Sequence, residues 1–135
     1  MELTAAHLRY LLAIYDVSQT HLDICSRSIA EKLGVPKPSV VRIMNLLMER
    51  GMIVKEHYGK IYLTDRGIFV AKEVKKQLET VLANFPPVKI ELTDEELCAA
   101  ALALPSALPE RAFTGEYDRL FGSDDETKTE TEIES

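Results

Sequence analysis

The sequence predicts a mainly α-helical protein with one small β-hairpin, followed by a short helical region and an acidic, disordered tail. Three observations support this fold class. Apolar residues recur at helical spacing through most of residues 1–84, one β-prone segment with a central glycine interrupts them, and residues 122–135 contain a single hydrophobic residue, Ile133. The 135 residues suffice for one compact core with a modest second element.

Two helices are expected at the start of the chain. The first covers residues 5–17 with Thr4 as its N-cap, and residues 18–21 form a polar loop after it. Its apolar stripe consists of Leu8, Leu11, Leu12 and Tyr15. The second helix covers residues 27–33, with the hydroxyl of Ser26 as its cap. A glycine directly after it provides the left-handed residue that commonly ends a helix.

A third helix follows a proline-containing turn and extends to Arg50, where Gly51 ends it. Pro38 is tolerated in its first turn because the N–H groups there have no partner within the helix. Its polar side contains Lys37, Ser39, Arg42 and Asn45. Its apolar side contains Val40, Ile43, Met44 and Leu47. The third helix is therefore expected to be amphipathic, with one buried face and one exposed polar face.

The residue pattern then changes from helical to extended. Residues 52–56 and 60–63 are β-prone runs on either side of a His-Tyr-Gly turn, which predicts a hairpin. Thr64 can cap a long fourth helix over residues 65–84. The buried side of this helix is expected to contain Ile68, Val70, Ala71, Val74, Leu78, Val81 and Leu82.

The C-terminal part is expected to contain two shorter helices. Thr93 and Glu96 have the spacing of a capping box, which opens a helix through Leu104, and Pro105 is expected to break it. A last amphipathic helix covers about residues 110–121. The expected division is a winged helix-turn-helix domain over residues 1–64, a linking helix with a small helical dimerisation region over residues 65–121, and a disordered acidic tail over residues 122–135.

Charge is unevenly distributed along the chain. The formal net charge is −6, which by itself argues against a nucleic-acid partner. However, 12 of the 16 lysines and arginines lie in residues 1–80, whereas 13 of the 22 acids lie in residues 81–135. The first part is therefore mildly basic and the second strongly acidic, which is compatible with an anionic partner for the first part alone.

The order of the expected elements is that of a winged helix-turn-helix. In this arrangement the second helix braces the third, whose N-terminal residues enter the major groove of DNA. Arg42 and Asn45 lie three residues apart on one helical face and could each make a bidentate contact with a base, whereas Lys37 and Ser39 suit phosphates. The alternative is that these polar residues form a solvated helix face, but the neighbouring helix, turn and hairpin together favour double-stranded DNA as the partner.

The hairpin is the expected wing, and it carries candidate phosphate contacts. Lys55, Tyr58 and Lys60 lie within six residues of one another. They could contact the DNA backbone, or Tyr58 could pack against the third helix while the two lysines keep an edge strand from pairing with other chains. Both roles are compatible.

Several segments together resemble the iron- and manganese-dependent repressors of the diphtheria-toxin-repressor type. They are residues 10–15 (YLLAIY), residues 28–35 (SIAEKLGV), residues 38–42 (PSVVR), and residues 59–64 (GKIYLT) with Gly67. The resemblance covers about residues 5–84 and continues more weakly to residue 121. It implies a homodimer that binds a palindromic operator and represses transcription, with Pro38, Ser39 and Arg42 among the positions that contact DNA.

The metal site of that family does not transfer to this sequence. The positions that match its ligands carry Arg9, Leu12, Leu78, Leu102, Pro105 and Ser106. None supplies a carboxylate, imidazole or thiolate donor of the kind that manganese, iron or zinc sites need. We therefore expect no metal and no other cofactor, although a different metal site made from Glu2, His7 or the acids at residues 91–96 is an alternative.

Other classes of function are less well supported. No phosphate-binding loop, HExxH or GxSxG motif is present, so the protein is not expected to be an enzyme. No apolar run approaches the ~20 residues of a membrane span, and the first residues lack the features of a secretory signal, so we expect a cytoplasmic protein without membrane contact. The alternative function is a winged-helix adaptor that binds other proteins with help from its acidic tail.

Overall fold

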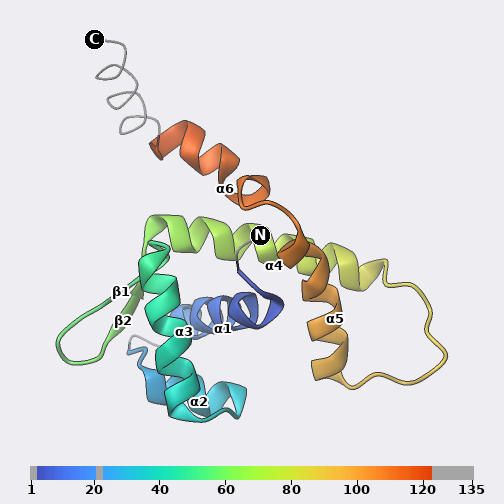
Figure 1. The fold of residues 1–135 in the computed structure, drawn as a ribbon, viewed down its shortest axis with the longest axis horizontal. Coiled ribbons are helices and arrows are strands. Elements are labelled where there is room, and N and C mark those ends of the chain that lie inside the picture. The colour runs from blue at the N-terminus through green and yellow to red at the C-terminus, as the bar shows by residue number, and fades with distance from the viewer. Residues whose placement is uncertain (1–2, 21–22, 123–135) are drawn as a thin grey trace.

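The computed structural model describes residues 3–20 and 23–122. Within them lie six α-helices, one two-stranded antiparallel sheet and a final π-helical turn. Figure 1 shows the long helix α4 (Asp65–Ala83) crossing the molecule, with the hairpin near its first end and α5 (Asp94–Ala107) near its second. Helix α6 (Arg111–Tyr117) lies on the opposite side of α4 from α1 (Ala5–Thr20). The mainly helical fold with one hairpin is confirmed.

Helix α1 is the centre of the core and extends one turn further than expected. Thr4 caps it, because its hydroxyl accepts a hydrogen bond from the N–H of His7 at 3.2 Å. The polar loop predicted from residue 18 is wrong up to residue 20: the hydroxyl of Ser18 donates to the carbonyl of Tyr15 at 2.5 Å, and that of Thr20 donates to the carbonyl of Val17 at 3.3 Å. Such bonds to the preceding turn allow polar residues to remain helical.

Helices α2 (Ser26–Leu33) and α3 (Lys37–Glu49) form the helix-turn-helix. Gly34 ends α2 in the left-handed conformation, with φ at 66°. The predicted cap of α2 is wrong: the hydroxyl of Ser26 is buried without a hydrogen-bond partner, and Cys25 occupies the N-cap position. The hydroxyl of Ser28 accepts from the backbone N–H of Cys25 at 3.1 Å. The four apolar residues predicted on the inner face of α3 are all buried.

The wing is a short hairpin of β1 (Ile53–Lys55) and β2 (Ile61–Leu63). Val54 pairs with Tyr62 in the antiparallel register. The N–H of Ile61 donates to the carbonyl of Ile24 at 2.8 Å, which ties the second strand to the segment before α2. These bonds fix the hairpin beside the helix-turn-helix.

Helix α4 begins where the wing ends. Thr64 caps it as predicted, by accepting a hydrogen bond from the N–H of Gly67 at 3.0 Å. Its inner face packs on α1 and α5 around buried Val70 and Val74. Leu82, predicted to be buried, is 38% exposed, because the last turn of α4 projects past the core.

Helix α5 passes through the proline that was expected to end it. The capping box of Thr93 and Glu96 is present, with both reciprocal hydrogen bonds at 3.0–3.1 Å. The predicted break at Pro105 is wrong, since α5 continues to Ala107 with the proline inside it. The Pro105 ring is buried, and this packing offsets the backbone hydrogen bond that a proline cannot donate. The predicted tail lies outside the described residues from residue 123 onward.

Candidate nucleic-acid interface

The exposed face of α3 contains the residues that sequence analysis assigned to DNA. Lys37, Pro38, Arg42 and Asn45 are exposed, and Ser39 is half-buried. Pro38, Arg42 and Asn45 are separated by four and three residues, so at 100° per residue they lie on the side of α3 opposite its buried face. The helix thus presents a guanidinium and an amide to solvent in neighbouring turns, the two groups that read guanine and adenine in the major groove.

An acidic residue lies on the same face, one turn further along α3. Glu49 is exposed and follows Asn45 by four residues. Its carboxylate would repel DNA phosphates, so a DNA contact made by this face would be confined to the first three turns of the helix. Sequence analysis did not single out Glu49, although its helical spacing from Arg42 and Asn45 could have revealed it.

One flank of α3 faces the first turn of α1. A depression of about 290 Å³ lies there, lined by His7, Arg42, Ile43, Asn45, Leu46 and Glu49. Burial and the positive charges of Arg50 and Arg42 lower the pKa of His7. Burial disfavours the charged imidazolium most, and the two guanidinium groups add to the effect because they raise the local potential. This local concentration of cations depends on the tertiary fold, so the spacing of these residues in the sequence gave no signal for it.

The other flank of α3 faces the wing. A groove of about 560 Å³ is lined by Met48 of α3 and by Lys55, Glu56, His57 and Tyr58 of the hairpin. Tyr58 is 92% exposed, so it does not pack against α3, which was one of the two roles considered for it. Tyr58 lies at the tip of the hairpin, where Gly59 has a positive φ of 80° that permits the tight turn, and the exposed Lys55 ends the first strand.

Lys60 is held differently from the other predicted wing residues. Its ammonium lies 2.7 Å from a carboxylate oxygen of Asp23. The hydrogen bond and the negative charge of Asp23 raise the pKa of Lys60. Because this charge is already paired, Lys60 is less available to a phosphate than Lys55.

The positions that match the family's metal ligands carry mainly buried apolar side chains and a paired arginine. Leu12, Leu102 and Pro105 are buried apolar residues. The guanidinium of Arg9 lies 3.5 Å from the carboxylate of Glu95 in α5. Across residues 3–20 and 23–122, no three His, Cys, Asp or Glu side chains gather as a metal would require. Glu2 lies outside the described residues, and His7 lies among cations, which disfavours a metal there.

Residues 26–57, about a quarter of the chain, match the IclR helix-turn-helix domain. The matched segment runs from the start of α2 to the tip of the wing. The chain has the winged helix-turn-helix fold. Among curated proteins, none matches it significantly.

Two solved structures share the fold of this winged-helix chain. The manganese regulator SloR superimposes with a TM-score of 0.58 at 24% identity, over 86% of this chain and 53% of that one. The hypothetical protein SSo2273 from Sulfolobus solfataricus superimposes with a TM-score of 0.53 at 21% identity, over 89% and 91%. The chain therefore spans about half the length of SloR. Together with the helix-turn-helix match, this fold supports a DNA-binding transcription regulator. No described helix is long and apolar enough to cross a membrane.

Proposed function

We propose that the protein is a sequence-specific transcription regulator that reads DNA with the exposed face of α3 and contacts flanking phosphates with the wing. The observation that carries this proposal is the arrangement of Arg42 and Asn45. Both side chains are exposed in neighbouring turns of α3, and Arg42 makes no ion pair with any described residue. Its guanidinium is thus free to form a bidentate pair with a guanine. Pro38 and Lys37 lie at the start of α3, where the helix first meets the groove.

Phosphate contacts are assigned to both flanks of α3. Lys55 and Tyr58 extend from the wing on one side, and His7 with Arg50 lies at the other. Lys55 on one side and Arg50 on the other, the second partly neutralised by its pairing with Glu110, would contact phosphates on either side of the groove. Such contacts fix the register of the helix without reading sequence. Ser39 can add a hydroxyl contact, whereas Lys60 contributes less because Asp23 pairs with it.

The regulator acts as a homodimer on a palindromic operator in this proposal. Helix α5 and the loop before it expose three large apolar side chains, which we assign to the dimer contact: Leu104 is 49% exposed, Val88 is 51% exposed and Ile90 is 69% exposed. Apolar surface of this kind is typical of protein–protein contacts. Because α5 and the wing lie at opposite ends of the molecule (Figure 1), pairing through α5 leaves both wings at the outer ends of the dimer.

Metal independence is the second part of the proposal. The side chains at the family's ligand positions are apolar or cationic apart from the hydroxyl of Ser106, and Arg9 is paired with Glu95. A divalent cation beside the Arg9 guanidinium would meet like charge, so DNA binding should not need one. Resemblance to metal-dependent repressors favours repression as the outcome of binding.

Selection of bound duplexes from a random library, with the full chain and with chelator or Mn(II) present, tests the function. The expected result is an enriched inverted repeat that is the same under both conditions. Absence of any enriched sequence at low salt would contradict the proposal and favour the adaptor function.

The oligomeric state is tested separately by sedimentation. The wild type should have twice the 15.2 kDa chain mass. Leu104→Glu should be monomeric, whereas Leu120→Glu, at a position 56% exposed after α6, should remain dimeric. A monomeric wild type, or a dimeric Leu104→Glu variant, would contradict the assignment of α5 to the dimer contact.

A further inference from the structure

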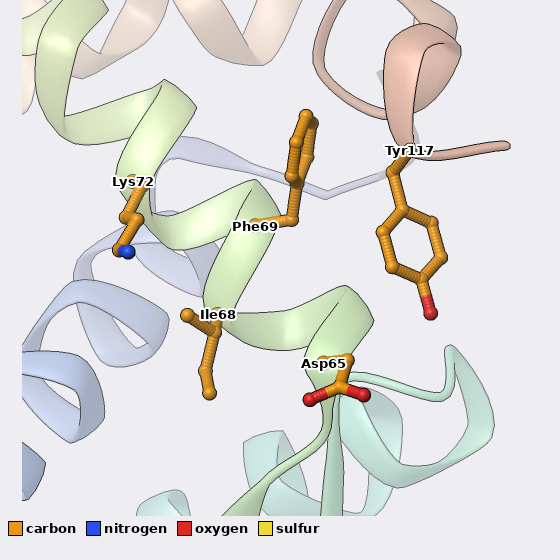
Figure 2. A pocket seen from close by; sticks show the side chains of 5 residues that line it. All are labelled: Asp65, Ile68, Phe69, Lys72 and Tyr117. Atoms are coloured by element: carbon orange, nitrogen blue, oxygen red, sulfur yellow. The ribbon is translucent and has the colours of Figure 1, made fainter. Parts of the chain in front are cut away.

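A pocket between α4 and α6 lies apart from the DNA-facing surface. Its volume is about 280 Å³. Four of its lining residues come from the first two turns of α4, namely Asp65, Ile68, Phe69 and Lys72, and Tyr117 at the end of α6 completes it (Figure 2). An apolar cavity of about 150 Å³ can hold benzene. This pocket therefore has room for a six-membered ring that carries substituents.

The walls of the pocket suit an aromatic ligand. The rings of Phe69 and Tyr117 have centroids 5.6 Å apart and are tilted by 49°. Together with Ile68 they provide apolar surface against which a flat ring can pack in an offset or edge-to-face geometry. Both aromatic side chains are half-buried, so a ligand that covers them removes further apolar surface from water.

Charge distinguishes the two ends of the pocket. Lys72 and Asp65 lie at opposite ends (Figure 2), seven residues apart on α4, which is about 10 Å along a helix axis. Lys72 is exposed, and its ammonium makes no ion pair with any residue in the described part of the chain. The Asp65 carboxylate lies at the end toward which the Tyr117 hydroxyl points. An anionic group is thus favoured at the Lys72 end and a hydrogen-bond donor at the Asp65 end.

We propose that this pocket binds a small aromatic carboxylate. The ring packs against Phe69 and Tyr117, the carboxylate pairs with Lys72, and a hydroxyl on the far side of the ring donates to Asp65. A cationic group at the Lys72 end would be repelled by the ammonium, and an aliphatic acid of the same length would lose the ring contacts.

The pocket is linked to α3 by a network of ion pairs through α6. Arg66, next to the pocket residue Asp65, lies 2.7 Å from Asp118, the residue after Tyr117. Arg66 also lies 3.5 Å from Glu110 at the start of α6. The other oxygen of Glu110 lies 3.8 Å from Arg50 at the end of α3. All four side chains are between one quarter and about one third exposed, so solvent screens these pairs less than pairs on the open surface.

A ligand that packs against Tyr117 acts on the C-terminal end of α6. The ion pairs at the two ends of this helix connect it to Arg66 and, through Glu110, to Arg50. Movement of α6 changes the position of Glu110 and therefore weakens or strengthens its ion pair with Arg50. Arg50 also lies near His7, beside the face of α3 that we assign to DNA. This coupling rests on the proposed DNA binding, whereas ligand binding in the pocket does not.

Calorimetric titration of the full chain with 4-hydroxybenzoate, without DNA, tests the pocket. We expect saturable binding with one site per chain. Lys72→Gln should weaken it by about fivefold, the effect of losing a partly exposed ion pair worth about 1 kcal/mol. Lys76→Gln, which changes an exposed lysine one turn further along α4 that pairs with Glu73, should bind like the wild type. 4-Hydroxybenzyl alcohol, which lacks the carboxylate, should bind about as weakly as the acid binds to Lys72→Gln.

The ligand site is wrong if 4-hydroxybenzoate does not bind at millimolar concentration, if both lysine variants lose affinity equally, or if the alcohol binds as tightly as the acid. The coupling is tested by operator affinity with and without 4-hydroxybenzoate. Wild type should change its affinity by at least twofold, and Glu110→Gln should respond less while it still binds the acid. An unchanged wild-type affinity, with the acid bound, would overturn the coupling alone. Failure to bind any operator would overturn the proposed function and leave the calorimetric result standing.

Discussion

Replacing Arg42 with alanine removes a guanidinium from the middle of the exposed face of α3. The side chain is exposed and makes no ion pair with a described residue, so the fold should lose little: surface changes of this kind alter the free energy of unfolding by about 0.5 kcal/mol or less. The effect on DNA binding should be much larger. A bidentate pair with a base is worth about 1–3 kcal/mol, which corresponds to a loss of about 5- to 150-fold in operator affinity.

Fluorescence anisotropy with the selected operator measures this loss. The variant should also discriminate less between the selected base and its alternatives at one operator position, because the lost contact reads a single base pair. Arg119→Ala is the matched control, since Arg119 is an arginine with a 72% exposed side chain beyond α6, where it pairs with Glu116. Its affinity should equal that of the wild type. Unchanged affinity in Arg42→Ala, or an equal loss in both variants, would refute the assignment of this α3 face to the major groove.

Three further predictions concern the wing, the start of α4 and pH. Lys55→Gln should reduce the magnitude of the slope of log K against log[salt] by the contribution of about one phosphate contact. Lys60→Gln should reduce it by less, because the carboxylate of Asp23 already pairs with Lys60. Equal slopes for the two variants in anisotropy titrations would contradict this prediction. Gly67→Ala should destabilise the fold by at least about 1–3 kcal/mol in urea unfolding, because the added methyl group would clash with the backbone oxygen of Met52, which has no room to shift. A variant as stable as the wild type would contradict the close contact between Gly67 and Met52. Burial and two guanidinium groups lower the pKa of His7 below 6.5, so below that pH the unfolded chain binds a proton more readily than the folded chain and stability falls. Between pH 7.5 and pH 5.5 the melting temperature should therefore fall more in the wild type than in His7→Gln. An equal fall in both proteins would contradict this prediction.

Helix periodicity was sufficient to predict the candidate interface on α3. The alternation of polar and apolar positions from Lys37 to Leu47 placed every buried residue of this helix correctly. The same logic placed the hairpin and the cap at Thr64. These features follow from local sequence, because amphipathic helices and glycine-containing turns are determined by neighbouring residues.

Features that depend on tertiary contacts could not be predicted in the same way. Pro105 lies within α5 because its ring is buried, which overrides the local preference of proline to end a helix. The pairing of Lys60 with Asp23 and the approach of Arg50 to His7 join residues 37 and 43 positions apart in the sequence. Neither spacing carries a signal in a single sequence, although both pairs change which cations are available to DNA.

The proposed function depends most directly on DNA binding by the full chain without metal. The decisive measurement is an anisotropy titration of the selected operator at several salt concentrations, with chelator and then with Mn(II). We predict that log K falls linearly with log[salt] and that the two titrations coincide. Binding that appears only with Mn(II) would contradict the metal-independent mechanism, and no saturable binding at low salt in either condition would contradict the assignment of α3 and the wing to DNA.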